Sequence, residues 1–254
     1  GNQGLIDFIE KIADRTGLPV GIKAAVGKLK DWENFAQLMK QQNKGPDFIT
    51  IDGGEGGTGA APPSFADHVS LPWMFAFRNI YKIFKHNDLS EKIVFIGSGK
   101  LGFPSKAAMA FAMGVDCINV AREAMLSVGC IQAKSCHTNT CPTGVATQSK
   151  WLQAGINVKD KGERVNYYFK NFRKELLEVT HASGYEHPCQ FTMDDIELNL
   201  SDQDFTKSLA DSFEYHKVKV PFEGVSSLQK CEYLGGNYNY KESKDSFEKE
   251  DVRY

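Results

Sequence analysis

A strand-then-helix alternation, repeated four times, constrains the fold of this chain more than any other feature. Short, largely apolar runs predict strands at 19–23, 47–51, 92–96 and 116–120. Helical spacing before and between these runs predicts helices at 4–16, 32–39, 73–84, 105–113 and 122–128. This order is typical of a parallel α/β sheet. Four units do not close a (β/α)8 TIM barrel, so the chain is either a small open sheet or the C-terminal half of such a barrel.

The C-terminal third is predicted to be less regular. Helical spacing over 163–181 predicts one long helix that stops at Gly184, and residues 192–200 predict a further short helix. Periodicity is lost from about residue 215, and the last fourteen residues hold nine charges of mixed sign, which is typical of a disordered or extended tail. We therefore expect a barrel-type domain at 1–200 and a partly disordered C-terminal extension at 201–254.

Composition limits the partners and the environment of the chain. Hydrophobic residues make up 41% and charged residues 24%, and the formal net charge is −2, so nothing points to nucleic acid as a partner. The longest apolar run, 107–121, contains Asp116 and is too short to span a bilayer. The six cysteines are unevenly placed, unlike those of a secreted domain held by disulfides, so we expect a reducing compartment, the cytoplasm. The chain begins at Gly1, and we expect it to be a fragment of a longer protein. Whether a membrane anchor precedes it stays open.

In a parallel α/β sheet, ligand-binding loops follow the carboxyl ends of the strands. The first predicted strand ends on Lys23, which is either a ligand-facing cation or an ordinary surface lysine. The second runs into a loop in which Glu55 lies among five glycines, Gly53, Gly54, Gly56, Gly57 and Gly59. Glycines let the backbone approach a ligand and can form an anion nest; the alternative is a flexible surface loop.

The third and fourth predicted strands are followed by residues suited to phosphate. The third ends at Ser98, Gly99 and Lys100, and the fourth at Ala121 and Arg122, where a helix opens. Loops at these two positions, with a helix N-terminus, form the usual phosphate site of barrels. Together they indicate a phosphate-bearing ligand.

Three of the six cysteines, Cys130, Cys136 and Cys141, follow in the pattern C-x5-C-x4-C-P. Close thiolates select zinc or iron–sulfur chemistry. Structural zinc normally needs four ligands with closer pairs, whereas three thiols and no fourth suit a three-iron, four-sulfur cluster. Three unliganded thiols are the alternative. A helix from Arg122 to Cys130 would span about 12 Å, so a cluster would lie near the phosphate ligand, which suggests flavin mononucleotide (FMN).

Two segments resemble a known family. Residues 54–62, Gly-Glu-Gly-Gly-Thr-Gly-Ala-Ala-Pro, and the cysteine motif from Gly129 to Gln148 are similar to the FMN-binding synthase domain of glutamate synthase. The resemblance covers roughly residues 1–200 and is closest to glutamate-synthase-like proteins that lack a glutaminase domain. It implies a (β/α)8 barrel with FMN and a [3Fe–4S] cluster. It also implies formation of an imine from 2-oxoglutarate and ammonia, which hydride from reduced FMN converts to glutamate.

The same resemblance implies roles for individual residues. Lys23 and Glu55 would be catalytic, with Lys23 also facing the flavin. FMN would be bound by Lys23, Gly53, Gly54, Gly56, Gly57, Ser98, Gly99, Lys100, Ala121 and Arg122. Cys130, Cys136 and Cys141 would bind the cluster. Ferredoxin or an NAD(P)H-oxidising subunit would donate the electrons.

The chain departs from the larger enzymes of this family in several respects. They carry His-Asp where this chain has Gly54-Glu55, and an acidic double-glycine loop where it has Ser98-Gly99-Lys100. No glutaminase nucleophile and no N-terminal half of the barrel are present, so we expect apolar strand edges that pair with a missing half. Three alternatives stay open: a flavin and iron–sulfur barrel acting on another amino or hydroxy acid, an electron-transfer module without a substrate of its own, and a zinc-stabilised scaffold.

Overall fold

The computed structural model describes residues 1–56, 61–66, 69–199 and 206–217. Gly57 and the predicted tail at 241–254 lie outside these residues. The helices and strands alternate along the chain in this order: α1 (Asn2–Thr16), β1 (Gly21–Ala25), α2 (Leu29–Gln42), β2 (Phe48–Asp52), α3 (Pro63–Ala66), α4 (Trp73–His86), β3 (Val94–Ser98), α5 (Pro104–Met113), β4 (Cys117–Asn119), α6 (Arg122–Ser127), η1 (Cys136–Thr138), α7 (Lys150–Gln153), α8 (Val158–Ala182), η2 (Pro188–Gln190), η3 (Met193–Asp195), β5 (Glu197–Asn199), β6 (Thr206–Ser208) and α9 (Leu209–Phe213).

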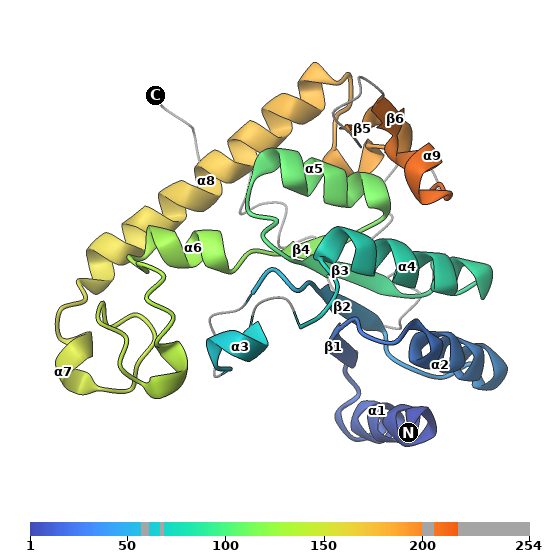
Figure 1. Cartoon of the computed structure of the whole chain (residues 1–254), viewed down its shortest axis with the longest axis horizontal. Coiled ribbons are helices and arrows are strands. Elements are labelled where there is room, and N and C mark those ends of the chain that lie inside the picture. Colours follow the sequence, from blue (N-terminus) through green and yellow to red (C-terminus); the bar gives the residue numbers. More distant parts are fainter. Residues whose placement is uncertain (57–60, 67–68, 200–205, 218–254) are drawn as a thin grey trace.

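The first four strands form one parallel sheet in the order β1-β2-β3-β4, as the alternation predicted (Figure 1). The strands lie up to two residues later in the chain than predicted: β1 starts at Gly21 and β3 ends at Ser98. Lys23 is therefore in the middle of its strand and not at its end, which corrects the sequence prediction. The sheet does not close into a barrel within the described residues, so the structure shows a mixed α/β fold with a four-stranded parallel sheet.

One face of the sheet is covered by helices, because alternate strand residues are apolar. Ile49, Ile51 and Phe95 are fully buried on this face, and α4 packs against β2 and β3. Along α4, the rings of Trp73, Phe77 and Tyr81 stack at 5.3 and 5.7 Å between centroids. Helices α5 and α2 flank α4, and α1 packs on α2 (Figure 1).

The other face of the sheet carries the alternate residues, several of them polar. The register aligns Lys23 with Thr50, and Asp52 with Ser98. At the two edges, β1 and β4 pair with no further strand in the described part of the chain. Cys117 and Asn119 on β4 are exposed. The edges are thus short and partly polar.

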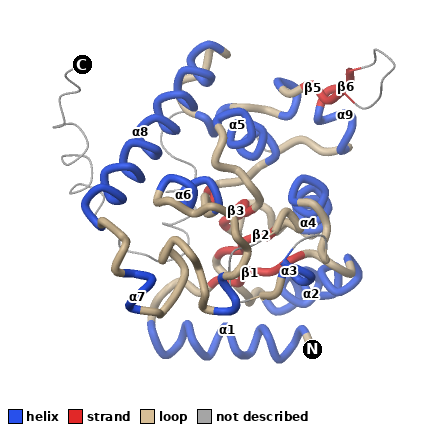
Figure 2. Tube along the Cα trace, turned by 60° about the vertical axis from the view of Figure 1, so that its left-hand side comes forward, coloured by secondary structure: helices blue, strands red, loops and turns tan. Residues whose placement is uncertain are grey.

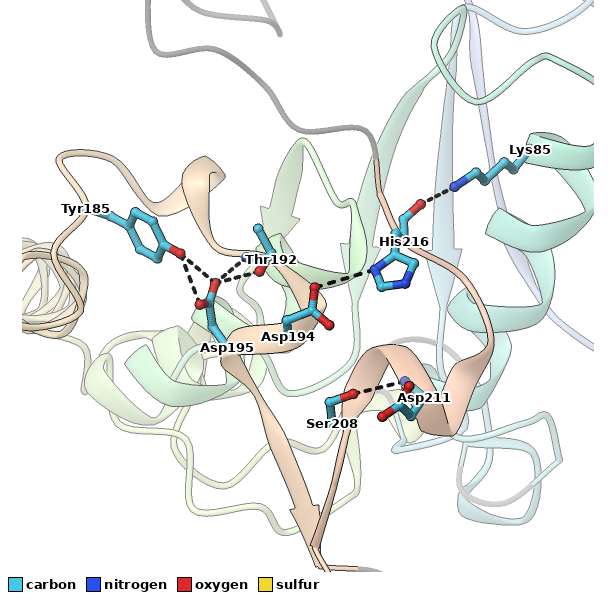
Figure 3. Close-up of polar contacts among 8 residues, drawn as sticks. All are labelled: Lys85, Tyr185, Thr192, Asp194, Asp195, Ser208, Asp211 and His216. Carbon is cyan, nitrogen blue, oxygen red and sulfur yellow. Dashed lines mark hydrogen bonds and ion pairs between the residues drawn. The ribbon is translucent and has the colours of Figure 1, made fainter.

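The segment after α8 differs from the prediction of one short helix at 192–200. A single 3-10 turn, η3, is followed by β5, which pairs antiparallel with β6. The turn forms because Asp195 accepts hydrogen bonds from the backbone and hydroxyl of Thr192, at 2.6 and 2.9 Å (Figure 3). Tyr185 donates to the same carboxylate. These local side-chain bonds compete with a regular helix.

Residues 206–217 lie across the outer side of α4 and α5. Phe213 is buried, and the centroid of its ring lies 5.5 Å from Cζ of Arg78 on α4. Tyr215 is buried and donates a hydrogen bond to the Met113 carbonyl at 3.1 Å. Lys85 donates to the His216 carbonyl (Figure 3). The start of the C-terminal extension is therefore part of the folded core, although its sequence shows no periodicity from about residue 215.

No helix in the described residues combines the length and the apolar character that a membrane span requires.

Candidate active site

Lys23 and Asp52 form an ion pair on the face of the sheet opposite α4, with Nζ 3.1 Å from Oδ2. The side chains are 57% and 38% exposed, so the pair adds little to stability. Because Asp52 is the last residue of β2, the pair lies at the carboxyl end of the sheet. A ligand carboxylate or phosphate could therefore take over the Lys23 ammonium at small cost.

The glycine loop is held by backbone bonds at its start. The N–H of Gly53 donates to the Ser98 carbonyl and the N–H of Gly54 to the Leu71 carbonyl, both at 2.8 Å. These two N–H groups are consequently not available to an anion nest in this conformation. Gly56 has φ = 95°, a left-handed value that suits glycine.

Glu55 joins the glycine loop to the N-terminus of α4. Its Oε1 accepts the Trp73 N–H at 2.6 Å, whereas Oε2 is buried without a hydrogen-bond partner among the described residues. A methyl group at Gly53 would overlap Oε2, and one at Gly99 would lie 3.0 Å from it and 2.5 Å from Cβ of Trp73. Glu55 and Trp73 thus fill the space that both glycines leave, which is a packing reason for glycine at these positions.

The two predicted phosphate loops begin at the same edge of the sheet. Ser98 at the end of β3 is paired in register with Asn119 at the end of β4. Gly99 and Lys100 therefore start beside the segment that leads to Arg122. Lys100 is exposed and has φ = 54°, and Arg122, half-buried, opens α6. Lys100 and Arg122 thus follow the neighbouring strands β3 and β4, and side chains of both kinds suit a phosphate group, whereas Lys23 lies on β1, at the opposite side of the sheet from β4.

A buried carboxylate beside Arg122 was not found from the sequence. Glu123 is 7% exposed, and its Oε2 has no hydrogen-bond partner in the described part of the chain. Burial first, and then the Glu123 charge, raises the pKa of Tyr168 to about 12. Tyr168 on α8 donates a hydrogen bond of 2.8 Å to the carbonyl of Gly102, in the loop after β3. An acidic residue in the first turn of a helix is usually an exposed one, so the sequence held no signal for this burial.

The cysteine loop starts at a Schellman motif that ends α6. Gly129 has φ = 103°, its N–H donates to the Leu126 carbonyl, and the Cys130 N–H donates to the Met125 carbonyl, both at 3.0 Å. The helix that opens at Arg122 therefore stops before Cys130, so a continuous helix does not join these two residues. Lys161 on α8 approaches Gly129, with Nζ 3.6 Å from the point that a Cβ on this glycine would occupy.

Asn139, another residue that the sequence did not single out, organises the loop after the second cysteine. It has φ = 62°, a value that asparagine tolerates. Its Oδ1 accepts the N–H of Gln148 at 2.6 Å and the hydroxyl of Thr147 at 3.0 Å. Its carbonyl accepts the same hydroxyl. This network closes residues 139–148 into a compact turn.

Cys141 lies inside that turn and is 7% exposed. Burial acts to raise the pKa of its thiol, but the Thr143 hydroxyl at 3.4 Å and three backbone N–H groups of residues 143–146 hold that pKa below its ordinary value. N–H groups directed at sulfur suit a thiolate ligand of an iron–sulfur cluster. The chemistry around Cys141 therefore fits such a cluster.

Cys130 and Cys136 are half-buried elsewhere on the same loop. Among the described residues, no group of three His, Cys, Asp or Glu side chains lies close enough together to hold a metal ion. The three thiols are thus on one loop but not assembled as ligands, and their role as a ligand set stays a prediction.

The chain is thus an α/β domain with a four-stranded parallel sheet, with glycines and cations in the loops that follow its strands and three cysteines in one later loop. Residues 2–186 match the family model described as "Conserved region in glutamate synthase". The chain belongs to the glutamate synthase family.

Curated relatives agree with this assignment. The chain is 42% identical over 198 residues to the Glutamate synthase large subunit-like protein YerD of Bacillus subtilis (strain 168), covering 78% of this chain and 38% of the relative. It is 34% identical over 142 residues to Ferredoxin-dependent glutamate synthase of Cyanidium caldarium, covering 56% and 9%. It is 33% identical over 192 residues to Ferredoxin-dependent glutamate synthase 2, chloroplastic, of Arabidopsis thaliana, covering 73% and 11%. The chain thus spans well under half the length of each of these relatives.

Proposed function

We propose that this chain is part of an oxidoreductase of the glutamate synthase type, which makes glutamate from 2-oxoglutarate and ammonia. The observation that supports the proposal is the carboxyl end of the sheet, with the Lys23–Asp52 ion pair on β1 and β2 and the loops of Lys100 and Arg122 after β3 and β4. Membership of the glutamate synthase family supports this reaction. The names of two relatives, which are called ferredoxin-dependent, support a protein electron donor.

In this proposal Lys23 binds the anionic keto acid or the flavin ring. Bound FMN would supply hydride transfer to the imine. Gly53, Gly54, Gly56 and Gly57 would flank the flavin, and Ser98, Gly99, Lys100, Ala121 and Arg122 would hold its phosphate. Cys130, Cys136 and Cys141 would be the ligands of a [3Fe–4S] cluster, which would supply one-electron transfer.

Glu55 was predicted to be catalytic. Its Oε1 is committed to the Trp73 N–H, which supports a positioning role between the glycine loop and α4. A direct role of Oε2 in the reaction stays a prediction.

The proposal is tested on the intact protein that carries this chain. Purified protein should contain flavin and iron with labile sulfide, and should form glutamate from 2-oxoglutarate and ammonium with reduced methyl viologen. Lys23→Ala should lower kcat/KM for 2-oxoglutarate by about 10²- to 10³-fold, whereas Lys11→Ala on α1, an exposed lysine, should not change it. Protein without flavin, or turnover with other keto acids but not with 2-oxoglutarate, would contradict the proposal.

A further inference from the structure

Tyr168 on α8 lies next to both of the segments that are proposed to hold the flavin phosphate. Its hydroxyl donates a hydrogen bond of 2.8 Å to the carbonyl of Gly102, two residues after Lys100 in the loop between β3 and α5. Helix α8 packs against α5 and α6, and both views of the fold show these three helices close together (Figures 1 and 2). One side chain of α8 is thus bonded to the loop of Lys100, beside the helix that Arg122 opens.

Residues from three parts of the chain meet at Gly102. A methyl group on this glycine would overlap the Tyr168 hydroxyl, and it would lie 2.8 Å from Cβ of Glu123 and 2.8 Å from Cγ1 of Val120. Glycine at this position therefore lets the loop between β3 and α5 lie directly against α8 and against the start of α6. Glu123, the residue after Arg122, is 7% exposed, so the start of α6 is buried at the same place.

Leu101 holds the same loop from the side of the core. This residue is 1% exposed, and its Cδ1 lies 2.9 Å from the point that a Cβ on Gly97 would occupy. Leu101 thereby packs against the end of β3, whereas the next residue, Gly102, is bonded to α8. Lys100, which precedes both residues, is exposed. The backbone that carries the Lys100 side chain is therefore fixed at the two residues that follow it.

We propose that Tyr168 is a positioning residue of the phosphate site: its hydroxyl keeps the Lys100 loop against the start of α6, so that Lys100 and Arg122 can bind the same phosphate group. This inference rests on the proposed function. A loop that is already ordered loses less conformational freedom when a ligand binds, and the affinity for that ligand is higher for this reason. The hydrogen bond from Tyr168 to Gly102 orders the loop before the phosphate arrives.

A positioning role and a purely structural role of Tyr168 lead to different results with two flavins. FMN carries the phosphate, whereas riboflavin has the same ring and no phosphate. If Tyr168 positions the phosphate loop, its hydroxyl matters for FMN and not for riboflavin. If Tyr168 only stabilises the packing of α8 on the domain, its loss weakens the binding of both flavins by the same factor. The ratio of the two dissociation constants therefore separates the two roles.

The test measures dissociation constants on the intact protein after removal of its flavin. Quenching of flavin fluorescence gives the Kd for FMN and for riboflavin, and calorimetry gives the Kd for inorganic phosphate. The variants are Tyr168→Phe, which removes only the hydroxyl, and Gly102→Ala, which pushes the loop away from α8. The matched control is Tyr167→Phe, the same change at the neighbouring tyrosine, which is 62% exposed. Circular dichroism checks that each variant is folded; if Gly102→Ala is not, Tyr168→Phe decides by itself.

Tyr168→Phe should raise the Kd for FMN about three- to tenfold, as expected from the loss of one hydrogen bond, and should leave the Kd for riboflavin unchanged. Inorganic phosphate should bind more weakly by a similar factor. Gly102→Ala should weaken FMN binding about tenfold or more, because the added methyl group displaces the loop, again without a matching change for riboflavin. Tyr167→Phe should change none of the three constants.

Unchanged FMN binding in Tyr168→Phe would overturn the positioning role. So would an equal loss for FMN and riboflavin, because the hydroxyl would then only stabilise the fold. Wild-type protein that binds FMN in this Tyr168-dependent way, yet makes no glutamate from 2-oxoglutarate and ammonium, would contradict the proposed function and leave the positioning role standing. The same holds for protein that binds inorganic phosphate in this way but neither flavin. Wild-type protein that binds none of the three ligands would overturn both.

Discussion

At the scale of single residues, the contact between Glu55 and the N-terminus of α4 explains why two neighbouring positions are glycine. The carboxylate of Glu55 accepts the first N–H of α4 and lies against Gly53 and Gly99. A helix has four unpaired N–H groups at its N-terminus, and α4 has no side-chain cap at Pro72. Glu55 supplies the missing acceptor from a loop eighteen residues earlier.

Glu55→Ala should lower the free energy of unfolding by about 1–3 kcal/mol, because it leaves the buried Trp73 N–H unpaired. Glu55→Gln keeps an acceptor oxygen and should cost less than Glu55→Ala. Denaturant titration of the protein measures both, with Glu175→Ala, an exposed residue of α8, as the control. Equal losses in the Ala and Gln variants would show that the acceptor oxygen is not what matters.

Gly99→Ala should destabilise the protein by about 1–3 kcal/mol, because the new methyl group would be forced against Trp73. Gly162→Ala is the opposite case, because a Cβ on this helical glycine would meet no atom within 4 Å beyond its chain neighbours and the backbone of its own helix. That change should stabilise the protein by about 0.5–1 kcal/mol. Thermal unfolding of the two variants gives the comparison, and a stable Gly99→Ala protein would contradict the packing described for Trp73.

At the scale of elements, the cysteine loop depends on Asn139. Asn139→Ala should destabilise residues 139–148, because it removes the acceptor for Gln148 and Thr147 and forces alanine into φ = 62°. Asn139→Gly loses the same hydrogen bonds but relieves the backbone. Hydrogen exchange of the Gln148 amide should accelerate in both variants, and more in Asn139→Ala. The exposed Asn166→Ala is the control; unchanged protection of Gln148 in Asn139→Ala would contradict this role.

Tyr168 joins α8 to the loop after β3, and this connection should depend on pH. Its folded pKa of about 12 lies above the ordinary value of 10.0. The stability contributed by the protonated hydroxyl is therefore complete below pH 10 and is lost as the pH rises from 10 to about 12. The difference in unfolding free energy between wild type and Tyr168→Phe should shrink across this window. A difference that stays constant from pH 8 to 11.5 would contradict the assignment.

At the scale of the whole molecule, the packing of segment 206–217 on α4 and α5 is stabilised by apolar burial rather than by its ion pairs. Phe213→Ala should lower the free energy of unfolding by about 3–5 kcal/mol, because Phe213 is 4% exposed. Glu214 is exposed, although it lies 3.0 Å from Lys82, so Glu214→Ala should leave stability nearly unchanged. Chemical denaturation separates the two, and a larger loss in Glu214→Ala would reverse this ranking.

Much of the sheet was predictable because its signals are local. Apolar runs and helical spacing placed four strands and their helices, with boundaries shifted by a few residues. The 192–200 segment was predicted wrongly, since Asp195 and Thr192 form side-chain bonds that redirect the backbone into a turn and a strand. The placement of Lys100 and Arg122 after neighbouring parallel strands was expected from the strand-helix order alone.

The sequence by itself determined the parallel α/β order and the three-cysteine loop, because both depend on the spacing of residues that are close together in the chain. Only the tertiary structure decided which groups are buried together: Glu55 with Trp73, Glu123 with Tyr168, and Phe213 with Arg78. These contacts join residues far apart in the chain, and the same residue types are ordinary surface residues elsewhere. Whether a side chain is buried depends on which residues of another element pack against it, and a local sequence pattern does not contain that information.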